Sequence, residues 1–474
     1  MYDKLIFEIK DKDIVEKSNF TEKYNINKKY LREDLDLPNL SEVDVVRHYT
    51  NLSLKNYGVD QGLYPLGSCT MKYNPKINET VASMDNFVKV HPMQPTSTTQ
   101  GALKVYYETS KLLSSLTGMS EFTFNPFAGA HGEAVGLMII KEYFIKKNDL
   151  KRNKIIIPDS AHGTNPASCN VVGFETIEIK SNSNGLVDLE ALKAVLDDTV
   201  AAIMLTNPNT VGIFEKDILE ISALVHNNGS LLYYDGANLN AILGVARPAD
   251  MGFDVMHINL HKTFSTPHGG GGPGSGPVGV VSKLTKYLPN PRVVYENGKY
   301  EFFKTKDSIG SISSFYGNFS VVLKAYTYIL ALGKENIMNV GKLAVLNANY
   351  IKEALKEDYL LAIDSTCMHE VVFDGLKDKT ATTLEVAKRL LDYGYHPPTI
   401  YFPLLFHQAL MIEPTETESK DTLDSFISVM KRIAEEARNS NELLKDAPHN
   451  TTVRRLDEVK AARNPILKYK DIKI

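Results

Sequence analysis

An aspartate and a lysine that follow two neighbouring apolar runs are the residues best suited to chemistry. Asp235 ends the run Ser230–Tyr234, and Lys262 follows the run Val255–Leu260, 27 residues after the aspartate. This interval is typical of one strand-loop-strand unit, so both residues are expected at the ends of adjacent strands. Pyridoxal phosphate (PLP) needs such a pair, because the lysine amine forms a Schiff base with its aldehyde and the carboxylate keeps its pyridine nitrogen protonated. Each residue alone is better explained as a surface lysine or a turn aspartate, and only the pair favours the cofactor.

Two histidines accompany this pair. His162 lies in Asp159–Asn165, just after the apolar run 155–157. An imidazole there can stack on the cofactor ring or transfer a proton. A hydrogen-bonded turn residue is the alternative interpretation of His162. His261 directly precedes Lys262 and is also expected to contact the cofactor.

A stretch of small residues, Phe127–Glu133, precedes a helix predicted at 133–147. Free backbone N–H groups and the helix dipole attract anions at such a helix start. Gly129, Ala130 and His131 are therefore predicted to bind the phosphate of the cofactor. Many ordinary helices begin in the same way, so the pattern carries weight only together with the lysine and the aspartate.

The segment Thr206–Thr210 follows another predicted strand, at 201–205. Asn207 is predicted to hydrogen-bond the phenolic oxygen of the cofactor, and Thr210 is predicted to contact the cofactor as well. The alternative is a simple turn, because asparagine and proline favour turns for independent reasons.

A glycine-rich loop, His268–Gly276, matches the pattern G-x-G-x-x-G from Gly269 to Gly274. The dinucleotide-binding interpretation fails, because that fingerprint needs a strand before it and a helix after it, whereas this loop leads into a strand predicted at 277–281. A backbone that approaches a ligand closely, or a mobile lid, fits better.

The elements around these residues alternate between short β-branched runs and amphipathic helical segments. The runs lie at 154–158, 201–205, 230–234 and 278–281. Such alternation predicts an α/β fold with a mainly parallel sheet and helices on both faces. Ligands of these sheets bind beyond the carboxyl ends of the strands. His162, Asn207 and the aspartate–lysine pair are therefore expected to meet in one crevice.

Three regions are predicted along the chain: an N-terminal arm at 1–60, a large PLP-binding domain at 61–335 and a small C-terminal domain at 336–474. The arm contains a helix at 42–54 that Ser41 caps. A helical stretch at 319–356, interrupted near Gly333 and Gly341, bridges the two domains. The small domain is predicted to contain a strand at 370–373 and helices at 383–392 and 421–444.

The composition excludes several classes of protein. The 474 residues are 43% hydrophobic and 23% charged with a net charge of −4, which is ordinary for a globular protein. No dense Lys/Arg stripe predicts nucleic-acid binding, no apolar stretch is long enough for a membrane span, and the start of the chain lacks the apolar core of a signal peptide. The cysteines are Cys69, Cys169 and Cys367. Their number and spacing predict neither disulfides nor a zinc site and favour the reducing cytoplasm.

The chain resembles subunit 2 of glycine dehydrogenase (decarboxylating), the P-protein family of the glycine cleavage system in its two-subunit form. The resemblance covers nearly the whole length and is carried by long motifs in the right order. They lie at 64–75, 161–167, 235–238 and 259–264, in the glycine-rich loop and at 449–458.

This resemblance implies a type I PLP-dependent transferase fold, with a seven-stranded type of sheet and a smaller C-terminal α/β domain. It implies PLP held covalently by Lys262, with His162 and Asp235 as further catalytic residues. Glycine would lose CO₂ and pass its aminomethyl group to the lipoyl disulfide of H-protein. The implied partners are subunit 1, two copies of each subunit assembling together, with aminomethyltransferase and lipoamide dehydrogenase in the same system. The loops at 64–72 and 268–276 are expected to form walls of a lipoyl channel.

Two alternatives stay open at this point. One is another type I PLP enzyme, an amino-acid decarboxylase or a cysteine desulfurase; a desulfurase needs a mobile exposed cysteine, and none of the three lies in an evident lid. The other is a scaffold subunit without turnover, which has no need of the lysine and the aspartate.

Overall fold

The computed structural model describes residues 4–9, 26–32, 38, 40–269, 274–468 and 471, and it divides into two compact units. Unit 1 comprises Met1–Gln61 with Pro448–Ile474, and unit 2 comprises Gly62–Ala447. In the part of the chain that is described, no helix combines the length and the apolar character needed to cross a membrane. The domain boundaries after residues 60 and 335 stay predictions.

Unit 2 contains a seven-stranded sheet in the order β1-β7-β6-β5-β4-β2-β3. Its strands are β1 (Glu121–Thr123), β2 (Lys154–Pro158), β3 (Glu175–Ile179), β4 (Val200–Leu205), β5 (Leu231–Gly236), β6 (Val255–Ile258) and β7 (Val278–Val280). Five neighbouring strands, β6, β5, β4, β2 and β3, are mutually parallel, whereas β7 runs antiparallel to both β6 and β1. The predicted mainly parallel sheet is therefore confirmed.

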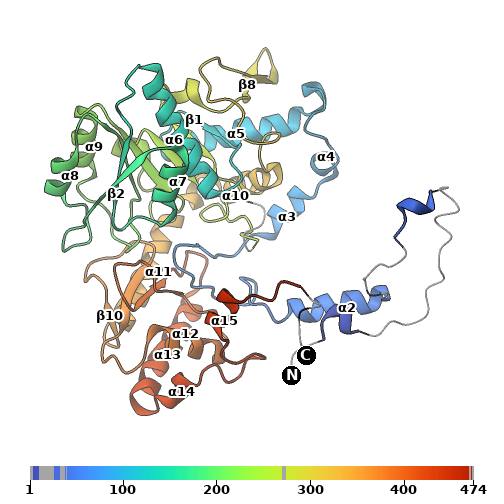
Figure 1. Cartoon of the computed structure of the whole chain (residues 1–474), viewed down its shortest axis with the longest axis vertical. Helices are drawn as coiled ribbons and strands as arrows, with labels where there is room; N and C mark the ends of the chain where they lie inside the picture. The colour runs from blue at the N-terminus through green and yellow to red at the C-terminus, as the bar shows by residue number, and fades with distance from the viewer. Residues whose placement is uncertain are drawn as a thin grey trace. The chain divides into compact units, whose positions relative to one another are not determined.

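Helices cover both faces of this sheet (Figure 1). They are α5 (Gln100–Thr117), α6 (Gly129–Lys146), α7 (Thr164–Val172), α8 (Leu189–Val195), α9 (Ile218–Asn227) and α10 (Phe319–Ile337). Alternate side chains of β5 separate the two cores: Tyr233 packs with residues of α6 and α7, and Tyr234 packs with residues of α5, α9 and α10. Because successive strand side chains point to opposite faces, this continuous apolar run suits a strand buried on both sides.

A second, antiparallel sheet forms a smaller lobe of unit 2, drawn in orange and red in Figure 1, in the order β10-β11-β13-β12. Its strands are β10 (Tyr359–Leu361), β11 (Val371–Leu376), β12 (Thr399–Ile400) and β13 (Ala409–Ile412). Its helices are α11 (Val340–Leu355), α12 (Thr383–Asp392), α13 (Lys420–Asn439) and α14 (Glu442–Lys445). A core of their buried apolar side chains holds this lobe together.

The helical stretch between the two lobes differs slightly from its prediction. Gly333 interrupts α10 with a φ of 68°, a left-handed conformation that glycine adopts without a steric penalty. The second break falls at Met338–Asn339, and Gly341 lies inside α11. The helix predicted at 421–444 is likewise divided, into α13 and α14.

The remaining elements are short. Unit 2 also contains α3 (Lys76–Ala82), α4 (Asp85–Val88), the hairpin β8 (Arg292–Glu296) and β9 (Lys299–Phe303), and 3-10 helices at Thr96–Thr98, Pro248–Met251 and Ser282–Tyr287. Unit 1 contains α2 (Glu42–Ser53), α15 (Glu458–Arg463) and 3-10 helices at Ile6–Glu8 and Lys28–Tyr30. The Ser41 hydroxyl accepts a hydrogen bond from the Asp44 N–H, which confirms the predicted cap of α2.

Candidate active site

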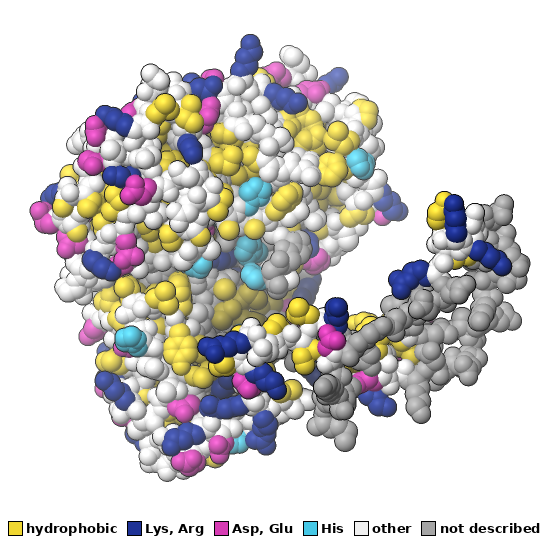
Figure 2. All heavy atoms as spheres, in the orientation of Figure 1, with side chains coloured by type: hydrophobic (Ala, Val, Ile, Leu, Met, Phe, Trp, Pro, Cys, Tyr) yellow, Lys and Arg dark blue, Asp and Glu magenta, His cyan; other side chains and the backbone are white. Residues whose placement is uncertain are grey.

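A cavity of about 270 Å³ lies where β2, β4, β5 and β6 end, and the smaller lobe contributes to its wall. Figure 2 shows histidine side chains gathered in the middle of the drawn face of unit 2. Seven predicted residues line the cavity: Gly129, Ala130, His162, Thr210, Asp235, His261 and Lys262. The predicted convergence of polar residues at the carboxyl edge of the sheet therefore holds for most of the set.

Asp235 sits at the end of β5 in a buried hydrogen-bond network. Its Oδ2 accepts from Asn165 Nδ2 at 2.9 Å, and its Oδ1 accepts from the Ala237 N–H at 3.1 Å. His257 Nε2 lies 3.3 Å from Oδ1, and His257 Nδ1 lies 3.0 Å from the Tyr233 hydroxyl. The carboxylate is thus fixed in orientation from both sides of the strand.

The electrostatics of this site keep Asp235 ionised. Burial alone would raise the pKa of Asp235, which is 3% exposed, but His257, the donors from Asn165 and Ala237, and then Lys262 together hold the pKa below its usual range. An ionised carboxylate in a dry pocket can hold a proton on a facing nitrogen base.

His162 is oriented by a second set of bonds. Its Nδ1 lies 3.0 Å from the Thr164 hydroxyl oxygen and 3.3 Å from the Thr164 backbone nitrogen. The Thr164 hydroxyl donates to Glu133 Oε1 at 2.7 Å, and the other oxygen of Glu133 accepts from Asn165 and Ser168. Glu133 therefore connects the turn that carries His162 to the network around Asp235.

The predicted phosphate cradle is the first turn of α6, because this helix begins at Gly129, earlier than predicted. Ala128 occupies the N-cap position, and its side chain makes no capping hydrogen bond among the described residues. The first N–H groups of the helix therefore stay available for an anion. A Cβ atom on Gly129 would lie 2.5 Å from Asn259 Oδ1, so the close approach of the helix to the pocket requires glycine.

Three predicted residues use their side chains in other ways. The buried amide of Asn207 contacts the backbone of Glu215, since its Oδ1 accepts from the Glu215 N–H at 2.9 Å. The His131 ring accepts from the Phe127 N–H at 3.2 Å. Neither is among the described residues that line the cavity. Thr210 does line it, but its hydroxyl donates to the Ser160 carbonyl at 2.5 Å.

Several buried polar atoms of the cavity wall lack a protein partner. Among the described residues, Thr206 Oγ1, Asn259 Oδ1 and His261 Nδ1 make no hydrogen bond. Buried polar groups are nearly always paired, so this cluster indicates a polar ligand. Burial, followed by Lys262 and His268, lowers the pKa of His261 to about 3, so His261 is neutral at physiological pH. The donor set fits PLP: a lysine, an ionised aspartate and a helix start for its phosphate.

The smaller lobe adds residues that sequence reasoning missed. His369 and Glu370 line the cavity, together with Ser68, whose N–H donates to Glu370 Oε2 at 3.0 Å. Glu413 lies beside them and accepts from Thr70 Oγ1 at 2.8 Å and from Asn238 Nδ2 at 3.0 Å. His369 and Glu370 directly precede β11, which is the wrong end of a strand for the rule used above. Glu413 follows the apolar run of β13 and did carry a usable signal.

Lys72 makes a second connection between the lobes of unit 2. Its ammonium group lies 2.6 Å from Glu416 Oε1, and both side chains are buried. Asn240 Nδ2 donates to the other oxygen of Glu416 at 3.0 Å. The loop that contains Ser68 and the turn after Asp235 therefore both bind the strand ends of the smaller lobe.

The two buried glutamates have unusual proton affinity. Burial raises the pKa of Glu370 to about 7; His369 opposes this rise and the neighbouring Glu413 adds to it. Burial likewise raises the pKa of Glu413 to about 7, against hydrogen bonds from Asn238 and Thr70 and the charge of Lys262. Two carboxyl groups this close and this dry oppose each other's ionisation.

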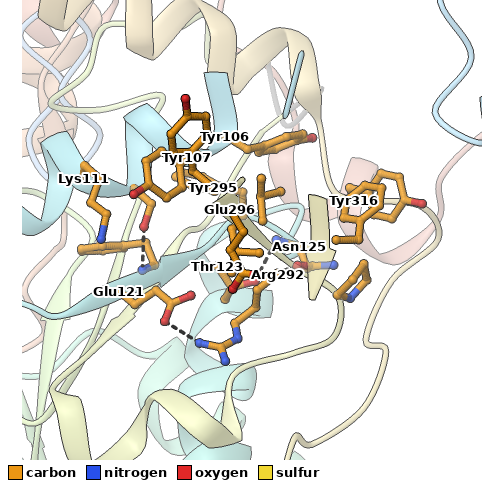
Figure 3. A pocket seen from close by; sticks show the side chains of 17 residues that line it. Tyr106, Tyr107, Lys111, Glu121, Thr123, Asn125, Arg292, Tyr295, Glu296 and Tyr316 are labelled. Atoms are coloured by element: carbon orange, nitrogen blue, oxygen red, sulfur yellow. Dashed lines mark hydrogen bonds and ion pairs between the residues drawn. The ribbon is translucent and has the colours of Figure 1, made fainter. Parts of the chain in front are cut away.

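A second cavity, of about 310 Å³, lies between α5, β1 and the β8–β9 hairpin. Figure 3 shows Tyr106, Tyr107, Tyr295 and Tyr316 around it, with Arg292 paired to Glu121. The lysine of this cavity, Lys111, lies over the Tyr107 ring, 5.3 Å from the ring centroid, and Arg292 is bound to Glu121, so neither matches the pairing of a lysine with a buried aspartate. The cavity at the carboxyl edge of the sheet is therefore the better candidate for catalysis.

Two protein families match this chain. A family described as "Glycine cleavage system P-protein" matches residues 8–297, and one described as "Glycine dehydrogenase, C-terminal domain" matches residues 340–454. A probable glycine dehydrogenase (decarboxylating) subunit 2 from Caldanaerobacter subterraneus subsp. tengcongensis is 64% identical over 93% of this chain and 92% of its own length. The protein of the same name from Alkaliphilus oremlandii is 57% identical over 99% of this chain and 98% of its own.

Solved structures share the fold. A glycine decarboxylase (P-protein) of the glycine cleavage system superposes with a TM-score of 0.73 at 19% identity, covering 88% of this chain and 95% of that one. A glutamate decarboxylase from Lactobacillus brevis gives a TM-score of 0.68 at 13% identity, over 89% and 97% of the two chains. A cysteine desulfurase from Escherichia coli gives 0.61 at 14% identity, over 79% and 95%. These likenesses show the type I PLP-dependent fold.

Proposed function

The chain belongs to the P-protein family of the glycine cleavage system, and we propose that it decarboxylates glycine and passes the aminomethyl group to the lipoyl disulfide of an H-protein. Family membership over nearly the whole length supports the reaction. The observation that carries the chemistry is the meeting of Lys262 and Asp235 in one cavity with neighbouring polar atoms that lack partners.

Lys262 is proposed to hold PLP covalently, and Asp235 to keep a proton on its ring nitrogen. The first N–H groups of α6, at Gly129 and Ala130, would hold the phosphate. When bound, PLP accepts the electron pair that stays on the glycine carbon when CO₂ leaves. His162, held by Thr164, is proposed to cover one side of the ring and to exclude water.

Asn207 and His131 have indirect roles in this proposal, because their side chains hold the protein backbone. Asn207 fixes the segment after β4 by its bonds to Glu215. His131 fixes the entry of α6 by its bond to Phe127. Thr210 reaches the cavity wall while it anchors Ser160.

Partners follow from the same family membership. We propose subunit 1 as the partner chain, two copies of each assembling together, and H-protein as the acceptor, alongside aminomethyltransferase and lipoamide dehydrogenase in the reducing cytoplasm. The walls of the lipoyl channel are proposed to include Ser68 and Gly274, which line the cavity. Residues 270–273 of the glycine-rich loop lie outside the described residues.

The alternative functions receive less support. A cysteine desulfurase needs an exposed cysteine, whereas Cys169 and Cys367 are buried and Cys69 is half-buried. Burial raises the pKa of the Cys69 thiol, which Lys262 opposes, so no reactive thiolate is favoured. A scaffold subunit has no use for the buried network that holds Asp235.

The test is glycine–CO₂ exchange by the purified chain supplied with PLP, with and without subunit 1 and lipoylated H-protein. We expect exchange only with the partner subunit, and a visible absorbance band that borohydride abolishes. Lys262→Ala should show neither the band nor exchange, whereas the matched control Lys180→Ala, which removes an exposed lysine, should keep both. Exchange by Lys262→Ala at the wild-type rate would exclude the assigned role of this lysine.

A further inference from the structure

Two buried glutamates lie opposite each other at the ends of two neighbouring strands of the smaller sheet, at the wall of the cavity. β11 and β13 pair antiparallel with Val371 opposite Ile412, which places Glu370 opposite Glu413. Carboxylate oxygens of this pair lie within 4.8 Å of each other and of a His369 nitrogen. Glu370 is 3% exposed and Glu413 is fully buried. Like charges directly opposite on a sheet repel, and burial removes the water that would screen them.

The hydrogen-bond donors around the pair are unequal. Glu413 accepts from the Thr70 N–H, the Thr70 hydroxyl and Asn238 Nδ2, which suits an ionised carboxylate. Glu370 accepts one hydrogen bond from the residues that the structure describes, and its donor is the Ser68 N–H. Hydrogen bonds to a carboxylate favour its charged form, so a single shared proton rests mainly on Glu370.

Other titratable groups face the pair from neighbouring elements. Lys262 and Cys69 come from loops of the larger lobe, and His369 is adjacent in sequence. Burial lowers the pKa of His369, an effect that Glu370 opposes and Lys262 reinforces, so this imidazole is a poor proton store. The raised pKa of the Cys69 thiol keeps it protonated too, but this side chain is not among the described residues that line the cavity. Glu370 is the acid that both lines the cavity and holds a proton near neutral pH.

The proposed reaction consumes one proton. The C–C bond of glycine breaks and CO₂ leaves without the electron pair, which then forms a C–S bond to one sulfur of the lipoyl disulfide. The S–S bond breaks as its electrons move to the second sulfur, which leaves as a thiolate. That thiolate must take a proton before it can leave a water-poor pocket as a thiol.

We propose that Glu370 and Glu413 share one proton beside Lys262, and that Glu370 delivers it to the sulfur released when the acceptor disulfide opens. This role rests on the proposed function. After delivery, both carboxylates are ionised and repel each other, so the pair takes a new proton from water. Glu370 is the donor at the reacting atoms, and Glu413 acts through Glu370 as a positioning residue.

The shared proton can be tested apart from catalysis by infrared titration of carboxylic-acid groups in the purified chain, with and without PLP. Glu418 offers a matched control, because burial also raises its pKa to about 7 and it is not among the described residues of the cavity wall. We expect wild type to show both acid signals near neutral pH. Glu370→Gln and Glu413→Gln should each remove the signal of the pair and keep that of Glu418, and Glu418→Gln should do the reverse. A spectrum unchanged by both Glu370→Gln and Glu413→Gln would overturn the shared proton.

Proton delivery is tested by aminomethyl transfer to lipoylated H-protein with subunit 1 present. Glu370→Gln should slow transfer by about 10²-fold or more, as loss of a general acid does. Glycine binding, followed by the visible absorbance of the cofactor, should change less than about twofold. Glu370→Asp should restore part of the rate with a shifted pH profile, which a purely structural residue would not produce. Transfer by Glu370→Gln at the wild-type rate at every pH would refute delivery.

The two proposals fail in different ways. If the wild-type assembly transfers no aminomethyl group, the proposed function and the delivery role both fall, and the infrared titration still decides the shared proton. If wild type transfers normally while Glu370→Gln is unaffected, only delivery falls.

Discussion

Two buried acidic sites face the same lysine from opposite lobes, and the pKa values of their carboxyl groups are shifted in opposite directions. At the edge of the seven-stranded sheet, Asp235 has a pKa held below its usual range. At the edge of the smaller sheet, Glu370 and Glu413 have raised pKa values. Burial raises the pKa in all three cases, and the sites differ in whether the neighbouring groups outweigh it.

The neighbours decide the outcome. At Asp235, the His257 imidazole, two hydrogen-bond donors and Lys262 together outweigh burial. At Glu370, burial and the Glu413 carboxylate outweigh the His369 imidazole and the Ser68 donor, and at Glu413 burial outweighs the donors and Lys262. The large lobe therefore supplies a permanent negative charge, and the small lobe supplies a proton that can be given away. One active site can obtain opposite behaviour from similar residues when it varies only what surrounds them.

The largest effect on catalysis is expected when Asp235 loses its charge. Asp235→Asn keeps the shape of the side chain but removes the charge that would hold a proton on the cofactor ring. We expect the rate of CO₂ release from glycine to fall by at least about 10²-fold. The measurement is the initial rate with saturating PLP, and Asp250→Asn, at an exposed ion pair, is the matched control. A loss no larger than that of the control would show that the buried charge is dispensable.

The two acidic sites should also differ in how they make the free energy of unfolding depend on pH. The folded-state pKa of the glutamate pair lies above its ordinary value of 4.5, so the folded chain holds a proton that the unfolded chain releases, and stability should fall as pH rises from about 4.5 to about 7. Asp235, with a lowered pKa, contributes stability that is lost only as pH falls below its ordinary value of 3.8.

Glu370→Gln should flatten this loss between about pH 4.5 and about pH 7, by an amount on the order of 2 kcal/mol. Urea unfolding at several pH values measures the change. Glu418→Gln should flatten the slope by a separate amount, because burial also raises the pKa of Glu418 to about 7, and the two effects should add in the double variant. A slope that is the same in wild type and Glu370→Gln would contradict the shared proton in the folded state.

The phosphate cradle lies in the large lobe alone, and a substitution there should have a smaller effect, on the affinity for PLP. Gly129→Ala places a Cβ atom against the Asn259 amide. We expect the affinity for PLP to fall about tenfold, which corresponds to about 1.4 kcal/mol. Equilibrium titration with PLP measures it, and Gly163→Ala, where a Cβ atom meets nothing within 4 Å, is the matched control. Equal affinities for the two variants would argue against the assigned cradle.

The smallest expected effect is a shift in the pKa of the glutamate pair. Thr70→Val removes one donor to Glu413 and leaves the backbone N–H in place. Because that hydrogen bond favours the carboxylate, its loss should raise the pKa of the pair by less than about one unit. The infrared titration of the pair should show the shift. A midpoint that moves downward would mean that the hydroxyl does not act on the charged form.

The sequence was informative where a strand ends in a polar residue. Tyr234–Asp235 and Leu260–Lys262 each join an apolar run to a reactive group, and parallel topology brings such ends together. Asn207 follows a strand by the same rule and His131 lies at the predicted helix start, but both side chains turn toward nearby backbone N–H groups. Spacing along the chain fixes where a residue lies and does not fix its rotamer.

Glu413 follows a strand and could have been found in this way, whereas Glu370 could not, for a different reason. Glu370 precedes its strand, and it reaches the cavity because an antiparallel sheet brings the start of β11 beside the end of β13. That pairing joins residues 43 positions apart and then meets a loop near residue 68. Contacts of this range depend on how two lobes pack, and no local pattern encodes them.

The hydrogen bonds from Asn238 and Thr70 to Glu413 have a further thermodynamic consequence. Asn238 lies in the larger lobe, and its hydrogen bond favours the ionised carboxylate, so the free energy of this contact between the lobes depends on the charge of the pair. Protonation of Glu413 weakens the contact, and loss of the Asn238 amide in turn raises the proton affinity of the pair.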